Sequence, residues 1–471
     1  MITQPKIIQG GMGIAVSNWE MARAVSQYGQ LGVVSGTAID NVLVRRLQLG
    51  DADGHMRRAL AAFPDKKMIG PILHRYFIEG GKDPNVPFLA AHKLVVNQIH
   101  SARELLVISS FVEVWLAKEG HQGLIGINLL EKIQMANGAS ILGAMMAGVD
   151  YVLMGAGLPR EIPHFIKEIS LGNAAQLSIE VKNATNPISI EINPKEFIPD
   201  SDFPIKRPQF LAIISSDILA TYLAREEITK PDGFIIESSI AGGHNAPPRG
   251  KIVLDENNEP IYGPRDEPNL EKIKALGLPF WLAGGFGKPE QLISALETGA
   301  AGIQVGTIFA LCEESGFTKE LRAQVLEQLD SGNLDIHTDL LASPTSFPIK
   351  IVSVPNSTSE SDVYETREKL CDLSYLRTPV EFASGRIGYR CSGEPDRAYL
   401  KKGGETESLI GRKCLCNGLM SNIGLPQHRL SGYVEPTLLT LGSDVEGLKE
   451  LHSHFKNGWS AKEAISYLLG L

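Results

Sequence analysis

Residues 279–307 read PFWLAGGFGKPEQLISALETGAAGIQVGT. Pro279–Ala283 and Gly302–Val305 are short apolar runs without polar alternation, which is typical of strands buried on both faces of a parallel sheet. Between them lies a segment with helical apolar spacing, and Pro289 stands where its first turn should begin. The stretch therefore predicts two parallel strands joined by a helix.

The same pattern recurs along the first 310 residues. Six further runs of this kind precede the stretch: Ile7–Gln9, Leu31–Ser35, Leu124–Asn128, Tyr151–Met154, Phe210–Ile214 and Gly233–Glu237. Eight buried strands alternating with helices favour an α/β fold of the (β/α)8 type, a TIM barrel, over an open doubly wound sheet.

The length of 471 residues exceeds what such a barrel needs. We expect residues 1–310 to form the barrel domain, with a helical insertion at 37–123 between the second and third strands. Without that insertion the segment fits a compact barrel of roughly 200–250 residues. Residues 311–471 form a C-terminal extension that we expect to be mostly helical. The clearest helical patterns outside the barrel are Asp40–Leu49, Gly54–Phe63, Leu94–Gly120, Thr318–Leu329 and Ser460–Leu469.

Composition and charge exclude several classes of function. The formal net charge is −9 and the hydrophobic content 43%, so the chain is an ordinary globular one without the basic surface that nucleic acid or an anionic membrane requires. The N-terminus has no basic segment leading into an apolar one, which predicts a cytoplasmic protein. The apolar stretch Ala139–Pro159 contains four glycines and is interpreted as a buried helix and strand. The sequence leaves open whether the protein forms a homo-oligomer.

Glycine-rich loops follow three of the predicted strands. They are Gly10-Gly11-Met12-Gly13, Gly284-Gly285-Phe286-Gly287 and Gly306-Thr307. Glycine lets a flat ligand lie directly against the backbone. Free amide groups at such turns bind phosphate, and barrels often place that site after strands seven and eight. The loops predict a phosphate-bearing ligand, and the alternative is that glycine only permits close packing of helix and strand.

His244 follows Gly242-Gly243 in the loop after the sixth strand, before Pro247-Pro248. An imidazole that titrates near neutrality suits proton transfer to or from carbon. We therefore expect His244 to be catalytic or to bind substrate. No His-Glu-x-x-His metal motif and no Gly-x-Ser-x-Gly nucleophile motif is present.

Together these motifs resemble the nitronate monooxygenase family, formerly called 2-nitropropane dioxygenases. The resemblance rests on five segments in this order: Ile7–Gly13, Asn128, Ala241–His244, Ala283–Phe286 and Gly302–Thr307. It covers roughly residues 5–310. The sequence departs from the family at Ser215-Ser216, where relatives often carry Lys, and at Gly10-Gly11-Met12, where many have Ala-Pro-Met.

The resemblance implies a TIM barrel that binds FMN. Gly11, Met12, Gly13 and Asn128 would face the flavin ring, and Glu237 would lie near the ring or the ribityl chain. The ribityl phosphate and its neighbourhood would be held by Gly243, Gly284, Gly285, Phe286, Gly306 and Thr307. His244 matches the family's catalytic histidine.

The implied reaction is the oxidation of alkyl nitronates, and of nitroalkanes as a further substrate class, by O2 to a carbonyl compound and nitrite. The sequence leaves two alternatives open. One is an FMN-dependent enoyl-(acyl carrier protein) reductase that uses NAD(P)H, because those barrels share the Ala-Gly-Gly-His pattern. The other is a flavin-binding scaffold without catalytic activity.

The C-terminal extension carries Cys371, Cys391, Cys414 and Cys416. Four thiolates are enough for a zinc or iron–sulfur site, but the spacing lacks the paired C-x2-C pattern. We therefore expect buried, reduced cysteines and no bound metal, with a four-cysteine metal site as the alternative.

Overall fold

The computed structural model describes residues 4–199 and 202–471. Its centre is a ring of parallel strands in the order β1-β10-β9-β8-β7-β4-β3-β2, which confirms the predicted TIM barrel. A parallel bridge between Ile8 and Leu31 joins the first strand to the last. The strands are β1 (Ile7–Gln9), β2 (Gly32–Ser35), β3 (Ile125–Leu130), β4 (Tyr151–Gly155), β7 (Gln209–Ile214), β8 (Gly233–Glu237), β9 (Phe280–Ala283) and β10 (Gly302–Val305).

The apolar runs become strands because both of their faces are buried. Side chains on the inner face form one buried cluster, which includes Ile8, Val33, Leu153 and Trp281. Their neighbours on the outer face, such as Ile7 and Val34, belong to a much larger cluster that continues into the surrounding helices. Layers of bulky side chains fill the interior of such a barrel, so its ligand sites lie at the ends of the strands.

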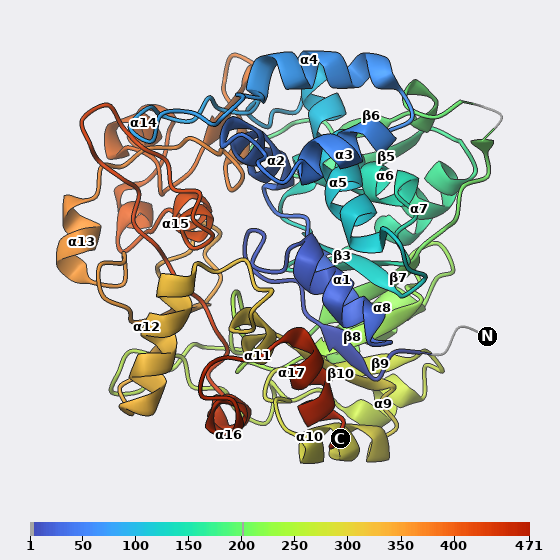
Figure 1. Ribbon diagram of the computed structural model, residues 1–471, viewed down its shortest axis with the longest axis vertical. Helices are drawn as coiled ribbons and strands as arrows, with labels where there is room; N and C mark the ends of the chain where they lie inside the picture. Colours follow the sequence, from blue (N-terminus) through green and yellow to red (C-terminus); the bar gives the residue numbers. More distant parts are fainter. Residues whose placement is uncertain (1–3, 200–201) are drawn as a thin grey trace.

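Helices connect consecutive strands and cover the outside of the barrel (Figure 1). The helix α10 begins at Pro289, as predicted, and the Asn18 side chain caps α1 by accepting from the Met21 amide at 2.9 Å. The barrel helices are α1 (Trp19–Gln27), α6 (Gln134–Met146), α7 (Ile162–Ser170), α8 (Asp217–Ala224), α9 (Leu270–Lys274), α10 (Pro289–Glu297) and α11 (Thr307–Ala310).

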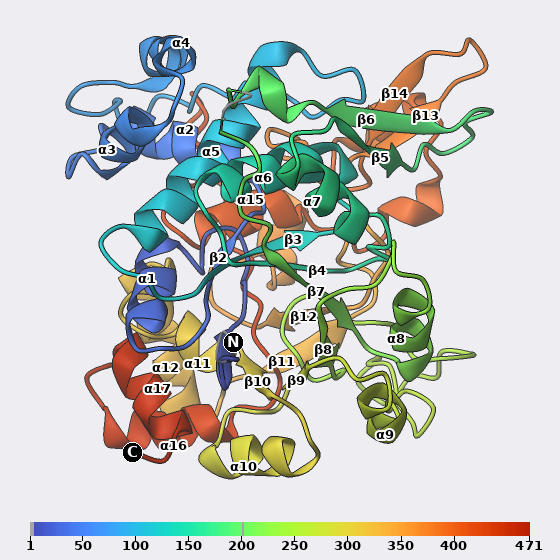
Figure 2. The same ribbon diagram turned by 90° about the vertical axis from the view of Figure 1, so that its right-hand side faces the viewer.

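The insertion between β2 and β3 is helical, as expected. It contains α2 (Ile39–Gln48), α3 (His55–Ala62), α4 (Lys66–Tyr76) and α5 (His100–Lys118). The last of these begins six residues later than Leu94, where the predicted pattern starts, and its apolar face packs against α6. Figures 1 and 2 place α2, α3 and α4 at one end of the molecule and α16 and α17 at the other.

Helices cover fewer than a third of residues 311–471, so the prediction of a mostly helical extension is wrong. The extension also contains two short hairpins that were not predicted. The helices are α12 (Lys319–Asp330), α13 (Ser361–Thr366), α14 (Asp396–Lys401), a 3-10 turn at Thr406–Leu409, α15 (Leu415–Ser421), α16 (Glu446–His454) and α17 (Ala461–Leu468). The strand pairs are β11 (Ile336–Asp339) with β12 (Ile349–Val352), and β13 (Thr378–Glu381) with β14 (Ile387–Arg390), both antiparallel.

A third hairpin lies within the barrel sequence and was also missed. It consists of β5 (Ala175–Ile179) and β6 (Ile188–Ile192) and is followed by a 3-10 turn at Pro194–Glu196. Residues of β5 alternate between buried and exposed, which is the pattern of a strand with one solvated face. Lys182, just after β5, exchanges backbone hydrogen bonds with Pro379 and Glu381 of β13, so two of the unpredicted hairpins lie side by side (Figure 2).

The extension shares its buried interior with the barrel. The Trp459 side chain is fully buried, its indole N–H donates to the Ile308 carbonyl at 3.1 Å, and Leu441 belongs to the same buried cluster as the outer face of the strands. Among the residues that the structure describes, no helix is both long and apolar enough to cross a membrane.

Candidate active site at the carboxyl ends of the strands

One large cavity opens where the barrel strands end. About 250 Å³ of it is accessible to the centres of water-sized molecules. Its wall comes from the loops after β1, β8, β9 and β10, from the ends of β3 and β4, and from the C-terminal extension. Every site residue predicted from the sequence lines this cavity: Gly11, Met12, Gly13, Asn128, Glu237, Gly243, His244, Gly284, Gly285, Phe286, Gly306 and Thr307.

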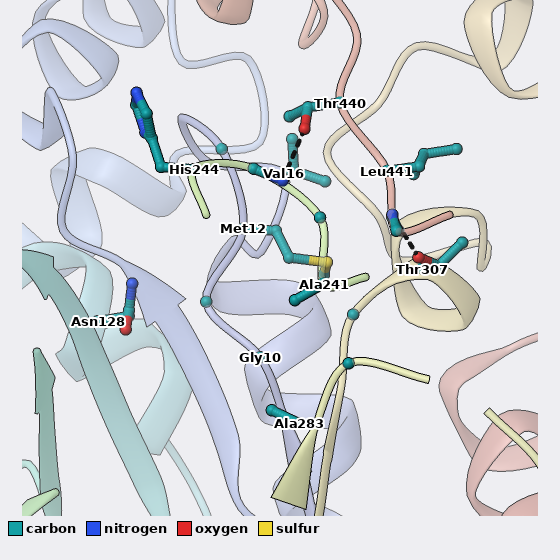
Figure 3. Close-up of a pocket in the computed structure, with 18 of the residues that line it drawn as sticks. Gly10, Met12, Val16, Asn128, Ala241, His244, Ala283, Thr307, Thr440 and Leu441 are labelled. Atoms are coloured by element: carbon teal, nitrogen blue, oxygen red, sulfur yellow. Dashed lines mark hydrogen bonds between the residues drawn. The ribbon is translucent and has the colours of Figure 1, made fainter. Parts of the chain in front are cut away.

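The loop after β1 lies against the end of β3. A Cβ atom on Gly11 would stand 2.2 Å from the Asn128 Cβ, so only glycine allows this approach. The Met12 amide donates to Ser17 Oγ at 2.8 Å, and the Gly13 carbonyl accepts from Ser35 Oγ at 2.6 Å. These bonds hold the backbone in one position beside Asn128 (Figure 3).

The loop after β9 presents unpaired amide groups. Gly284 and Gly285 have φ values of +83° and +77°, in the left-handed region that favours glycine. The amides of Gly285, Phe286 and Gly287 have no hydrogen-bond partner among the described residues. The loop leads directly into α10, so it has the donor arrangement that binds phosphate.

The C-terminal extension covers this side of the cavity, which the sequence analysis did not predict. The Gly243 amide donates to Thr440 Oγ1 at 2.8 Å, and the Gly442 amide donates to Thr307 Oγ1 at 3.0 Å (Figure 3). A Cβ on Gly242 would stand 2.8 Å from the Gly442 nitrogen. Gly242 therefore serves close backbone packing, and its neighbour Gly243 has its amide occupied by the extension.

His244 lies at the side of the cavity near Asn128, away from Thr307 and Leu441 (Figure 3). Its Nε2 atom is 2.6 Å from Ser343 Oγ and 3.4 Å from Thr345 Oγ1. Burial, with a smaller contribution from the Lys132 ammonium, lowers the pKa of His244 to about 4. The imidazole is therefore neutral at physiological pH.

Two polar groups face the cavity without a partner. Burial raises the pKa of Glu237 to about 7, and no side chain among the described residues pairs with its carboxyl group. The Oε1 atom of Gln304, which also lines the cavity, is buried and accepts no hydrogen bond. An unpaired buried oxygen is costly unless a ligand satisfies it, so these groups fit a polar cofactor that carries its own donors.

The glycine surfaces fit the same kind of cofactor. Gly10, Gly11 and Gly13 line the cavity without side chains, which suits a flat ring, and the free amides of the loop after β9 suit a phosphate. The residues present are thus suited to FMN.

The four cysteines of the extension come together around a second, much smaller cavity of about 10 Å³. None of the four forms a disulfide in the described structure, and burial raises the pKa of each thiol. Within the described ranges 4–199 and 202–471, no group of three or more His, Cys, Asp or Glu side chains is placed to hold a metal ion.

Comparison with known proteins gives one match by sequence and several by structure. The family model described as nitronate monooxygenase matches residues 170–338. No curated protein sequence matches the chain.

The structural likenesses are distant. A structure titled FabK from Thermotoga maritima is 14% identical, with a TM-score of 0.48, and the match covers 100% of this chain and 92% of that one. A nitroalkane oxidase from Streptomyces ansochromogenes is 13% identical, with a TM-score of 0.41, and the match covers 90% of this chain and 95% of that one. The enoyl reductase domain of MlnA from Bacillus amyloliquefaciens is 12% identical, with a TM-score of 0.37, and the match covers 76% of this chain and 66% of that one.

The family match includes Glu237, His244 and both glycine loops that follow β9 and β10, whereas Gly11 and Asn128 lie outside it. It therefore bears on the part of the cavity wall that carries His244 and the glycine loops after β9 and β10. Over residues 170–338 the chain matches the nitronate monooxygenase family, as its motifs predict.

Proposed function

We propose that this protein is an FMN-dependent oxidoreductase that oxidises alkyl nitronates with O2 to a carbonyl compound and nitrite. The observation that carries the proposal is that His244, the unpaired Glu237 carboxyl group and the glycine loops meet in one cavity at the carboxyl ends of the barrel strands. The family match over residues 170–338 supports it.

Bound FMN would supply the redox chemistry that links oxidation of the substrate to reduction of O2. In this proposal the backbone of Gly11–Gly13 and the Asn128 side chain hold the ring. The amides of Gly285 and Phe286 hold the phosphate, together with Gly306 and Thr307. Glu237, protonated below about pH 7, donates one hydrogen bond to the cofactor through its O–H and accepts another through its carbonyl oxygen.

His244 orients the substrate. A neutral imidazole offers one N–H donor, which suits the oxygens of a nitronate. A pKa of about 4 makes His244 a weak base, so abstraction of the α-proton from a neutral nitroalkane is slow. The proposed enzyme therefore turns over nitronates, which have already lost that proton, faster than the corresponding nitroalkanes.

A second candidate function is the reduction of an enoyl thioester with NAD(P)H. The observation that favours it is an apolar part of the cavity wall contributed by the C-terminal extension: Leu376, Leu415, Leu419, Leu441 and Leu448. These side chains offer surface against which an acyl chain can pack.

Two assays on the FMN-loaded protein separate the candidates. Nitronate oxidation predicts nitrite release in air and little bleaching of the flavin by anaerobic NADPH. Enoyl reduction predicts rapid bleaching by NADPH, reoxidation by an enoyl thioester and no nitrite. A protein that binds FMN but gives neither result is a flavin-binding scaffold, and that result contradicts both enzymatic proposals.

A further inference from the structure

The nearest partner of the His244 side chain belongs to the C-terminal extension. Ser343 is fully buried, and its Oγ lies 2.6 Å from His244 Nε2. It also lies 2.8 Å from Thr345 Oγ1 and accepts from the Thr345 amide at 3.2 Å. The other ring nitrogen, His244 Nδ1, has no hydrogen-bond partner among the described residues.

The number of hydrogen bonds that the Ser343 hydroxyl can form restricts which of its neighbours donate to it and which accept from it. A hydroxyl group has one donor and two acceptor sites, and the Thr345 amide occupies one acceptor site. When Nε2–H of the histidine donates to Ser343, the serine donates to Thr345 and Nδ1 is an unprotonated acceptor. When Ser343 donates to Nε2 instead, Thr345 donates to Ser343 and Nδ1 carries the proton. Each tautomer of His244 therefore requires its own arrangement of the two hydroxyls, and only the second leaves an N–H at Nδ1 to donate to a nitronate oxygen.

The segment that carries Ser343 is fixed to the rest of the protein. The Arg412 guanidinium donates to the carbonyls of Ser343 and Leu341 and, at 3.1 Å, to Ser346 Oγ. On the other side, β12 pairs with the histidine loop, because the Lys350 amide donates to the Gly243 carbonyl at 2.9 Å. The histidine loop and the serine segment are thus held at a defined separation.

We infer that Ser343, supported by Thr345, is a positioning residue that fixes the orientation and the tautomer of His244 for substrate. The inference rests on the proposed role of His244. It assigns to residues 311–471 a part in the reaction, because the barrel alone provides no partner for Nε2 in the described structure. Ser343 acts through the histidine and is not a catalytic residue.

Three variants of the full chain test the inference. Ser343→Ala removes the hydroxyl that bonds Nε2. Thr345→Val removes the second hydroxyl, and Thr345→Ser keeps it. Ser357→Ala is the matched control, because Ser357 is equally buried in the extension but its hydroxyl bonds, among the described residues, only to Val354 and Ser359.

The first measurement is the ring ¹⁵N spectrum of histidine-labelled protein at pH 7, with the His244 signals assigned from His244→Asn. We expect one neutral tautomer in the wild type and in Ser357→Ala, and a mixture in Ser343→Ala. Thr345→Val should shift the populations and Thr345→Ser should restore them. If the ring ¹⁵N chemical shifts of His244 in Ser343→Ala equal those of the wild type, the inference is wrong. If Ser343→Ala does not fold, the comparison of Thr345→Val with Thr345→Ser decides.

The second measurement is turnover of an alkyl nitronate. Ser343→Ala should lower kcat by about 10- to 100-fold with little change in KM, because a misplaced reacting group costs rate more than binding. FMN affinity should stay at the wild-type value. Absence of turnover in the wild type would contradict the proposed function alone, because the ¹⁵N spectra still decide the role of Ser343.

Discussion

Two residues of the cavity, Glu237 and His244, have pKa values far from their ordinary ones. Glu237 ends β8 and His244 lies in the loop that follows it. Burial lowers the pKa of His244 to about 4 and raises that of Glu237 to about 7. Both groups are therefore uncharged at slightly acidic pH. Such paired shifts are common at functional sites, where they set which groups donate and accept protons.

His244→Asn tests the histidine directly. Asn keeps a polar side chain but cannot take part in proton transfer, so nitroalkane turnover should fall by about 10²- to 10⁴-fold. Nitronate turnover should fall less, because its substrate needs no deprotonation. Steady-state kinetics with both substrates measures the difference, and full turnover of both with FMN bound contradicts the assignment.

Glu237 makes the stability of the cofactor-free protein depend on pH. Because its pKa is raised in the folded state, the folded protein binds more protons than the unfolded chain between about pH 4.5 and 7. The contribution of Glu237 is therefore fully present below pH 4.5 and is lost as pH rises through 7, with a cost of about 2–3 kcal/mol. Glu237→Gln should abolish this loss.

Urea unfolding at pH 5 and pH 8 measures the effect. Glu227→Gln serves as the control, because the Glu227 side chain is 93% exposed. The same pH dependence in wild type and Glu237→Gln would contradict the raised pKa.

At the scale of elements, the glycine loop after β9 offers a matched pair of substitutions. A Cβ on Gly284 would stand 2.4 Å from Ser238 Oγ in a backbone with φ +83°, whereas a Cβ on Gly287 would meet nothing closer than 3.5 Å. Gly284→Ala should therefore strain the loop and cost about 1–3 kcal/mol. Gly287→Ala should leave it unchanged.

Titration of each variant with FMN, followed by quenching of flavin fluorescence, gives the affinities. We expect a loss of at least about tenfold for Gly284→Ala and wild-type affinity for Gly287→Ala. Equal affinities for the two variants would show that the loop geometry does not matter for the cofactor.

The elements also show which parts of the structure the sequence could predict. The barrel strands are buried on both faces, so each is a continuous apolar run. Such a run can be recognised in the sequence without knowledge of the segments that it contacts. The contacts of Thr440 with Gly243, and of Ser343 with His244, join residues about 100 to 200 positions apart. Loops such as 343–346 carry no periodic pattern, so only the folded chain reveals their role at the site.

The two hairpins of the extension were missed for a related reason. Their strands have four residues each, and β13 contains Pro379, which weakens a strand pattern. What stabilises them is pairing with neighbouring segments, as between Lys182 and β13. The glycine loops were predictable because strand ends and helix starts bracket them in the sequence.

At the scale of the whole molecule, barrel and extension share one buried interior. Trp281 lies inside the barrel and Trp459 in the extension, and both are almost completely buried. Because the extension packs on α1, α10 and α11 and bonds to the cavity loops, we expect the two parts to unfold together.

Two single-tryptophan variants separate the reporters in urea unfolding, because the chain has four Trp residues. One keeps Trp459 and carries Phe at 19, 115 and 281, and the other keeps Trp281 and carries Phe at 19, 115 and 459. Fluorescence of the Trp that remains in each variant should follow a transition that coincides with far-ultraviolet circular dichroism of the same variant. A fluorescence transition for Trp459 well below that of the circular dichroism signal would show that the extension unfolds independently.

The proposed function depends on binding of FMN in the cavity at the carboxyl ends of the strands. Its most direct test is the visible absorption spectrum of the purified protein after incubation with FMN and removal of the free cofactor. We predict flavin absorption bands at about one FMN per chain, with Gly284→Ala reducing the amount retained. A colourless wild-type protein that takes up no FMN would contradict the claim.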